Sequence, residues 1–276
     1  MGACAMRNES ASNTSSTHVF RSLLHGANRR LGEIPNRHTA AGDKGIPIRI
    51  GINAGSLEKD LLKKYGRPEP QALVESAERN IRILEEMNFA NLKVSLKGSD
   101  VLTTVDAYRL FSEKYDYPLH IGISEAGPPS TGIIKSSVGC GLLLSEGIGD
   151  TIRVSLTADP EEEVRVAYEI LKSLGLRKKG VEIVSCPTCG RCGIDLRGLA
   201  TEVEYRLRKI DRPMKIAVMG CVVNGPGEAR EADFGIAGGK GRGVLFRKGK
   251  IIKKLKENEL LEALLKEIEE YQSSYL

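Results

Sequence analysis

The chain has 276 residues, of which 41% are hydrophobic and 28% are charged, so it can bury one large core or two modest ones. Its net charge of +5 is modest, and it has no Trp and only 5% aromatic residues. These values exclude an aromatic stacking surface for nucleic acid, and we expect the basic excess to serve an anionic small molecule or an acidic redox partner. The sequence has no run of about 18 apolar residues, so we expect no membrane-spanning segment.

The first 45 residues differ in character from the rest of the chain. They hold three of the four His residues, several Ser and Thr residues, and no sustained apolar period. Residues 1–30 are rich in Arg and Ser and have one acid, which is the composition of a transit peptide. A disordered leader explains the same composition, and we prefer that interpretation. We expect the first folded domain to begin at residue 46.

Residues 46–178 alternate between short apolar, β-branched runs and amphipathic helical patterns. Such alternation predicts a parallel sheet with covered faces, here from four βα units. The predicted strands are 47–52, 92–96, 119–123 and 151–155, and the helices that follow them are 71–87, 101–114, 133–146 and 161–174.

Polar side chains interrupt the predicted strands, and we place them near the carboxyl ends. In βα proteins that edge of the sheet binds ligands. Each of these residues alone is more often an ordinary strand-end polar group, but the joint pattern predicts a binding site. The candidate residues are Arg49, Asn53, Lys97, Glu125, Arg153 and Ser155.

Residues 179–276 read as a second, smaller α+β domain. The predicted strands are 181–185, 215–219, 234–237, 244–247 and 250–254, with helices over 195–208 and 258–271. The Gly-rich stretch 235–243 has no strand-to-helix exit, so we interpret it as a turn between strands and not as a phosphate-binding loop.

The second domain carries the most specific motif of the sequence. Cys186 and Cys189 form a CxxC pair, and Cys221 follows in a Gly- and Pro-rich run that ends at Glu228. Zinc sites and iron–sulfur clusters both use this spacing, and a redox dithiol is a further alternative. Structural zinc rarely uses a carboxylate, and three thiolates would leave one iron of a cubane cluster open, so we favour the cluster. Clustered cysteines of this kind also indicate a reducing compartment, the cytoplasm.

Two sequences in this domain, Cys-Pro-Thr-Cys-Gly-Arg from Cys186 and Gly-Cys-Val-Val-Asn-Gly-Pro-Gly-Glu from Gly220, are characteristic of one family. From about residue 46 the chain resembles the 4-hydroxy-3-methylbut-2-enyl diphosphate synthase (IspG/GcpE) family. The resemblance implies the C-terminal half of a TIM-type (β/α)8 barrel followed by an iron–sulfur domain. It also implies that the first four βα units of the family are missing, because about 45 leader residues cannot supply them.

The resemblance further implies the reaction and the roles of the candidate residues. The reaction is the two-electron reductive ring opening and dehydration of 2-C-methyl-D-erythritol 2,4-cyclodiphosphate. Electrons come from flavodoxin or ferredoxin, and the family works as a homodimer. Glu125 and Glu228 are the implied catalytic residues. The implied substrate-binding residues are Arg49, Asn53, Lys97, Arg153, Ser155 and Asn224, and the implied ligands of a [4Fe–4S] cluster are Cys186, Cys189, Cys221 and Glu228.

Two other interpretations remain from the sequence. The chain is alternatively a truncated, non-catalytic cluster- or zinc-binding protein that acts in electron transfer or as a scaffold. Cys192 departs from the family pattern and extends the CxxC run in a ferredoxin-like spacing, and we interpret it as a bystander. Cys140 and Cys4 are expected to be inert thiols.

Overall fold

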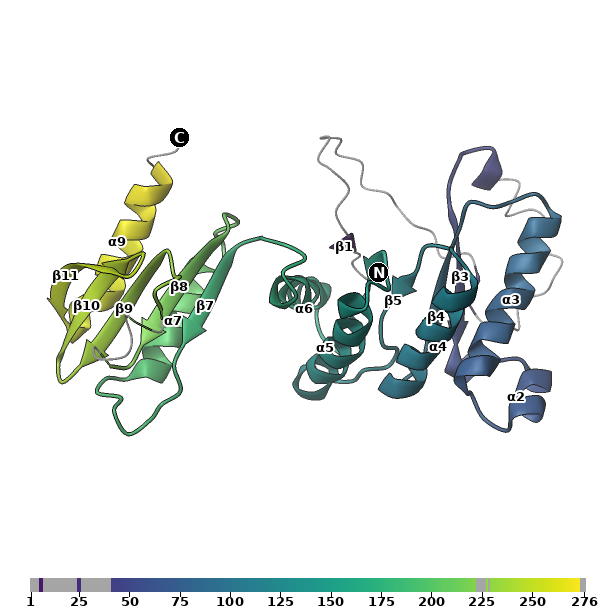
Figure 1. Cartoon of the computed structure of the whole chain (residues 1–276), viewed down its shortest axis with the longest axis horizontal. Coiled ribbons are helices and arrows are strands. Elements are labelled where there is room, and N and C mark those ends of the chain that lie inside the picture. The colour runs from purple at the N-terminus through teal and green to yellow at the C-terminus, as the bar shows by residue number, and fades with distance from the viewer. Residues whose placement is uncertain (1–4, 7–23, 26–40, 222–226, 228, 274–276) are drawn as a thin grey trace. The chain divides into compact units, whose positions relative to one another are not determined.

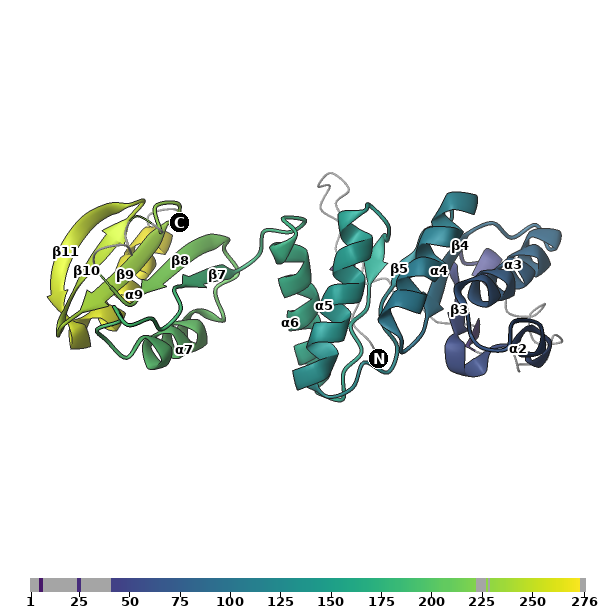
Figure 2. The same cartoon turned by 60° about the horizontal axis from the view of Figure 1, so that its bottom comes forward.

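The structure is a computed structural model that describes residues 5–6, 24–25, 41–221, 227 and 229–273. The chain divides into two compact units, Met1–Arg177 and Lys178–Leu276 (Figures 1 and 2), and each is described by itself. No helix in the described ranges combines the length and the apolar character needed to cross a membrane.

Strands and helices alternate along the first unit as the sequence predicts. The order is β3 (Ile48–Asn53), α2 (Lys59–Tyr65), α3 (Pro70–Glu86), β4 (Leu92–Lys97), α4 (Val101–Lys114), β5 (His120–Ile121), α5 (Pro129–Ser145), β6 (Thr151–Ile152) and α6 (Pro160–Ser173). Helices α3, α4, α5 and α6 follow one another in a row (Figure 2). The short helix α2 was not predicted, and strands β5 and β6 are shorter than predicted.

The strands of the first unit form two small sheets. Strand β4 pairs in parallel with β3, and β3 pairs in parallel with the dipeptide β2 (Leu24–His25). Strand β6 pairs in parallel with β5 and antiparallel with the dipeptide β1 (Ala5–Met6). Among the described residues, a β-bridge between Val94 and Leu119 links the two sheets. The strands of the described ranges do not close into a complete barrel.

A buried tyrosine completes the junction between the two sheets. The Tyr108 side chain is fully buried, and its hydroxyl accepts a hydrogen bond from the Leu96 N–H at 3.0 Å and donates one to the His120 carbonyl at 2.8 Å. Tyr108 therefore joins β4 to β5 through its side chain, at Leu96 and His120, where the two strands are not paired by a described backbone bridge.

The core of the first unit lies between the strands and the helices. Alternate residues of β3 and β4, including Ile50, Val94 and Leu96, are fully buried against apolar residues of α3 and α4 such as Leu73 and Phe111. Full burial of one such side chain contributes about 1.5–3 kcal/mol. The other residues of these strands point to the opposite face, where the candidate polar side chains lie.

The second unit is a five-stranded sheet with the order β11-β10-β9-β8-β7. Strands β7 (Val181–Ser185), β8 (Met214–Met219) and β9 (Phe234–Gly239) are parallel to one another. Strands β10 (Arg242–Arg247) and β11 (Lys250–Lys256) extend the sheet as antiparallel hairpins.

The Gly-rich stretch contains a tight hairpin turn, as predicted. Gly239 pairs with Arg242, and both residues between them, Lys240 and Gly241, have positive φ, which is the type I′ geometry. The turn between β10 and β11, Lys248–Gly249, has the same conformation.

Helices α7 (Leu196–Leu207) and α9 (Leu260–Ser273) share one core with the sheet. Val203 and Leu264 lie in this core with Ile216, Phe234 and Leu245. The alternate residues of the strands form a separate cluster, in which Ala217, Met219 and Phe246 pack with Ala229 and Ala232 from the segment after β8. Loops from β7 and β8 leave the sheet at the same edge because the two strands are parallel.

Candidate functional site

Three candidate residues and one further lysine, Lys93, lie on one face of strands β3 and β4. The strand register pairs Arg49 with Lys93 and Asn53 with Lys97, and Gly51 and Ser95 lie between these pairs. Because side chains alternate along a strand, all of them share the face opposite the helices. The side chains of Lys93 and Lys97 are 7% and 5% exposed, so two ammonium groups are buried within one strand.

The position predicted for Arg49 needs a correction. Arg49 is the second residue of the six-residue strand β3, and Asn53 is the last. The two residues are about 13 Å apart along the strand. The backbone of Arg49 therefore lies near the amino end of β3 and not near its carboxyl end. The prediction was wrong because it took all polar residues of the run as one group.

Gly122 allows Lys97 to lie close to the backbone of Arg153. A Cβ on Gly122 would lie 2.3 Å from the Arg153 carbonyl oxygen and 3.3 Å from the Lys97 Nζ atom. The Arg153 N–H donates to the Ile121 carbonyl at 2.9 Å. The absence of a side chain at Gly122 thus lets the end of β5 approach the segment after β6, with the Lys97 ammonium beside it.

A buried histidine lies among the same cations. His120 is 4% exposed, and its Nδ1 atom is 2.7 Å from the Thr151 Oγ1 atom. Burial lowers the pKa of His120 far below its usual range, and the positive charges of Lys97, Arg49, Lys93 and Arg153 lower it further. His120 is therefore neutral, and four cations from strands β3 and β4 and the segment after β6 act on it.

Sequence reasoning missed Lys93 and His120. The strands were read as apolar runs buried on both faces, which hides a polar residue in the middle of a run. The available signal was the period of two in Lys93, Ser95 and Lys97, which marks a strand with one polar face.

Glu125 lies in the loop after β5, in a conformation that residues other than Gly rarely adopt. Its φ is +54°, and its side chain is exposed. The flanking backbone is held by two hydrogen bonds, from the Ser124 N–H to the Gly98 carbonyl at 3.0 Å and from the Thr157 N–H to the Gly127 carbonyl at 3.0 Å. Such local strain is often found at functional sites. The last candidate of this unit, Ser155, is half-buried three residues after β6 ends.

In the second unit, two of the three candidate cysteines follow neighbouring parallel strands. Ser185 pairs with Val218, so the loops that carry Cys186 and Cys221 leave the same edge of the sheet. The Cys186 Sγ atom accepts a hydrogen bond from the Gly220 N–H at 3.2 Å. Backbone N–H groups directed at cysteine sulfurs are a common feature of metal-binding cysteine sites.

The other cysteine of the CxxC pair, Cys189, is exposed. Hydrogen bonds from the Arg191 backbone and then from its side chain lower the pKa of Cys189 below its usual value. The described cysteines therefore suit a soft metal centre in their chemistry and in their placement at one sheet edge. Within the described ranges, however, no three His, Cys, Asp or Glu side chains are gathered closely enough to hold a metal ion. Asn224 and Glu228 lie outside the described residues.

Cys192 has a structural environment of its own. Its thiol donates to the Ile194 carbonyl at 3.4 Å, and its Sγ atom would lie 2.6 Å from a Cβ on Gly220. It packs against the core of the second unit. Cys140 of α5 is fully buried, and burial raises its pKa to about 12, which fits the inert thiol that the sequence predicts.

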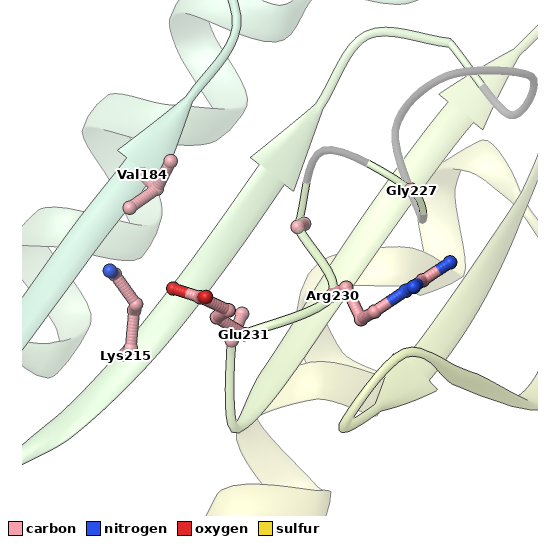
Figure 3. Close-up of a pocket in the computed structure, with 7 residues that line it drawn as sticks. Val184, Lys215, Gly227, Arg230 and Glu231 are labelled. Carbon is pink, nitrogen blue, oxygen red and sulfur yellow. The ribbon is translucent and has the colours of Figure 1, made fainter.

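A pocket of about 300 Å³ lies in the second unit between the sheet and the segment that follows β8 (Figure 3). Its lining mixes charges of both signs from Lys215, Arg230 and Glu231. The Lys215 Nζ atom is also 3.5 Å from a carboxylate oxygen of Glu182. The pocket therefore lacks the excess of positive charge found around His120, and we do not assign an anionic ligand to it.

Comparison with known proteins gives two family matches that together cover most of the chain. Residues 30–168 match the GcpE TIM-barrel domain, and residues 182–270 match the GcpE protein C-terminal domain. These matches agree with the fold class expected from the motifs, a barrel-type domain followed by a smaller one.

Close relatives carry one name. Proteins called 4-hydroxy-3-methylbut-2-en-1-yl diphosphate synthase (flavodoxin) from Thermodesulfovibrio yellowstonii and Geobacter sulfurreducens are 65% and 62% identical to this chain over 230 residues. The protein of that name from Clostridium perfringens is 61% identical over 230 residues. Each alignment covers 83% of this chain but only 65–66% of the relative. On the strength of both domain matches and these identities, the chain belongs to the GcpE family.

Proposed function

We propose that this chain performs the chemistry for which its relatives are named, the synthesis of 4-hydroxy-3-methylbut-2-enyl diphosphate from a cyclic diphosphate. The reaction consumes two electrons and two protons, opens the ring and releases one water. The observation that carries the proposal is the group of cations on one face of β3 and β4, where Arg49 pairs with the buried Lys93 and Asn53 pairs with the buried Lys97, in a chain that also carries the three-cysteine motif.

The substrate site lies on the polar face of the first unit. Two linked phosphates carry dense negative charge, and guanidinium and ammonium groups bind it through charge-assisted hydrogen bonds. At Gly122 the Lys97 ammonium lies near the backbone of Arg153, and the charges of Arg153 and Arg49 act on the neighbouring His120. Asn53, at the end of β3, and Ser155 supply neutral hydrogen-bonding groups at the carboxyl end of the strands.

Glu125 provides a carboxyl group beside this site. In our proposal it anchors a substrate hydroxyl or supplies a proton to the ring carbon that is reduced. The left-handed backbone at Glu125 supports this role, because the loop holds an exposed carboxylate in a costly conformation.

Cys186, Cys189, Cys221 and Glu228 would hold a [4Fe–4S] cluster. When bound, the cluster would supply single electrons and a Lewis-acidic iron. The residues of the chain provide three soft donors at one sheet edge, a backbone N–H directed at Cys186, and the carboxylate of Glu228. Asn224 adds an amide to the same loop for the substrate. The five described cysteines are all free thiols, which supports a reducing, cytoplasmic location.

The four βα units form half of a TIM-type barrel in this proposal, and the active protein is a homodimer. The surface of α5 supports the dimer. Ile134, Val138 and Leu142 are 63%, 48% and 36% exposed and are spaced four residues apart, so they form an apolar stripe on one side of the helix. Substitution of Ile134 and Val138 by Lys should convert a dimer to a monomer in light scattering, while substitutions at the charged surface of α6 should not. A wild-type monomer would refute this part of the proposal.

A binding experiment tests the substrate site. Calorimetry should detect binding of the cyclic diphosphate to the chain, and Lys97→Met should weaken it by roughly ten- to a hundredfold, because one charge-assisted contact contributes about 1.5–3 kcal/mol. Lys135→Met is the control, because this lysine is exposed on α5. Equal effects of the two substitutions, or no binding at all, would contradict the assignment.

Metal analysis tests the cluster independently. Anaerobic reconstitution should give about four iron and four sulfide per chain. Cys186→Ser should abolish the cluster, whereas Cys192→Ser should retain it because the Cys192 thiol faces the Ile194 carbonyl. Stoichiometric zinc without sulfide would instead support the non-catalytic, zinc-binding alternative.

A further inference from the structure

The net charge of the chain resides in one of its two units. Lys178–Leu276 has 19 Lys and Arg residues and 14 Asp and Glu residues, a net charge of +5, whereas Met1–Arg177 has 22 of each and is neutral. The excess is concentrated further within the second unit. Residues 234–256, which form β9, β10 and β11, include eight Lys and Arg residues and no acid.

The strand directions divide these cations between two edges of the sheet. Strands β7, β8, β9 and β11 all end at the edge where β10 begins. This edge carries the loops of Cys186 and Cys221, and we call it the cysteine edge. Lys248 and Lys250 lie at the other end of β10, about 17 Å away along a six-residue strand.

Three exposed cations, Lys240, Arg242 and Lys256, lie at the cysteine edge, and we call them the basic rim. The turn that carries Lys240 contacts the CxxC loop directly. A Cβ on Gly193 would lie 2.9 Å from the Lys240 backbone nitrogen and 3.0 Å from the Gly239 Cα atom. The turn that carries Lys240 is therefore adjacent to the loop that carries Cys186 and Cys189.

The residues of the basic rim destabilise the fold of the second unit. Arg242 and Lys256 are directly opposite one another in the β10–β11 register, and like charges in that position repel. Lys240 has a φ of +50° at a turn position where Asn, Asp or Gly is preferred. No ion pair of a rim residue is seen among the described residues. The nearby acids Asp195 and Glu259 accept hydrogen bonds from the backbone N–H groups of Gly198 and Lys256.

Protection of an exposed sheet edge explains only one of the three cations of the basic rim. Lysines on an edge strand prevent sheets from pairing edge to edge, and β11 is such a strand. Lys240 and Arg242 are not on the edge strand, so protection of the edge does not explain them. The position of these two residues beside the CxxC loop requires another reason.

We infer that the basic rim is the docking site for the acidic surface of the electron-donor protein. The inference rests on the proposed function and assigns its redox partner to a surface. Complementary charge speeds the encounter of two proteins and fixes their orientation, which here brings the donor to the edge that carries the cysteines. The names of the relatives specify flavodoxin as their donor, so flavodoxin is the probe.

The two hairpin turns allow a matched pair of variants. The rim variant is Lys240→Glu/Arg242→Glu, and the control is Lys248→Glu/Lys250→Glu. Lys240 and Lys248 each occupy the first position of a Lys-Gly turn, with φ of +50° and +46°, and all four side chains are exposed. Both variants change the net charge equally, so they separate a local docking site from a general effect of charge.

Binding of a purified, oxidised bacterial flavodoxin to the full chain should be measured by calorimetry at 50 mM and 300 mM NaCl. We expect the rim variant to raise the Kd about tenfold at low salt and to reduce its salt dependence, with less than a twofold change in the control. Equal weakening in both variants, an unchanged Kd in the rim variant, or no binding by the wild type would overturn the inference. Thermal unfolding checks the fold, and Lys240→Gln/Arg242→Gln replaces the rim variant if the latter fails to fold.

This measurement separates the inference from the proposed function. Flavodoxin binding requires no turnover, so its result stands even if the chain proves inactive or binds zinc. Reduction of a reconstituted cluster by dithionite, which needs no docking site, should be equally fast in all variants. If the rim variant instead weakens binding of the cyclic diphosphate and leaves flavodoxin binding unchanged, the rim serves the substrate and the docking inference is wrong.

Discussion

Removal of one buried hydroxyl tests how the first unit positions its cations. Tyr108→Phe keeps the aromatic ring in the core but leaves the Leu96 N–H and the His120 carbonyl without the partner that joins β4 to β5. A buried polar group without a hydrogen bond costs about 1–3 kcal/mol, so two such groups should lower the free energy of unfolding by about 2–6 kcal/mol in total. Lys97 follows Leu96 directly, and His120 carries the carbonyl that loses its partner. The distance between Lys97 and His120 should then no longer be fixed.

Hydrogen exchange followed by mass spectrometry is the appropriate assay, because the chain has two units and a single unfolding transition is not assured. Peptides that contain β4 and β5 should exchange faster in Tyr108→Phe, and inorganic pyrophosphate should bind more weakly. Tyr117→Phe is the control, because it removes only an exposed hydrogen bond to Glu85, which is worth less than about 1 kcal/mol. If both variants exchange alike, the Tyr108 hydroxyl does not hold the two sheets together and the reasoning is refuted.

Two further predictions concern the same unit. Gly122→Ala should lower the free energy of unfolding by about 1–3 kcal/mol or more, because the new Cβ would meet the Arg153 carbonyl at 2.3 Å. The control Gly141→Ala, in a helix with open space, should gain up to about 1 kcal/mol, and equal effects in urea unfolding would contradict the packing argument. The pKa of Glu75 is lowered to about 2, first by its hydrogen bond with Lys64, so its contribution to stability is present above its ordinary pKa of 4.5 and is lost as the pH falls towards 2. Glu75→Gln should flatten the loss of stability in that window, and an unchanged acid titration of stability would refute the assignment.

Local signals explain where the sequence predicted elements well. The helix predicted over 101–114 has these bounds in the structure, because the Asp100 side chain accepts a hydrogen bond from the Thr103 N–H and caps the helix. The strand predicted over 181–185 is also observed with these bounds. The missed helix α2 has seven residues, four of them charged, and ends at Gly66 with a φ of +79°. Its length is too short for an apolar period to stand out, and its stability depends on contacts with α3.

Nonlocal geometry explains where the sequence failed. The predicted strands 119–123 and 151–155 retain only two residues each, and Glu125, two residues beyond the first of them, takes a left-handed conformation. Arg49, Lys93 and His120 could not be placed relative to one another without the register of β3 and β4 and the bridge to β5. Several residues of the proposed anion site, such as Lys97 and Arg153, were therefore found from the sequence, but the position of each side chain along its strand was not.

For the cysteine site, too, the sequence predicts the general position but not the distances between side chains. Parallel strands fix the edge from which Cys186 and Cys221 leave, and that edge follows from the order of strands in the sequence. The distances between the sulfur atoms follow from the conformations of two loops, in which Cys189 is exposed. Metal bonds contribute a large part of the free energy that orders such loops, so ligand geometry is coupled to binding. The Gly220 N–H donates to the Cys186 Sγ atom at 3.2 Å, so the end of strand β8 holds this thiol in place. We therefore expect Cys186 to be the thiol whose position changes least when the cluster is reconstituted, and Cys189 the one whose position changes most.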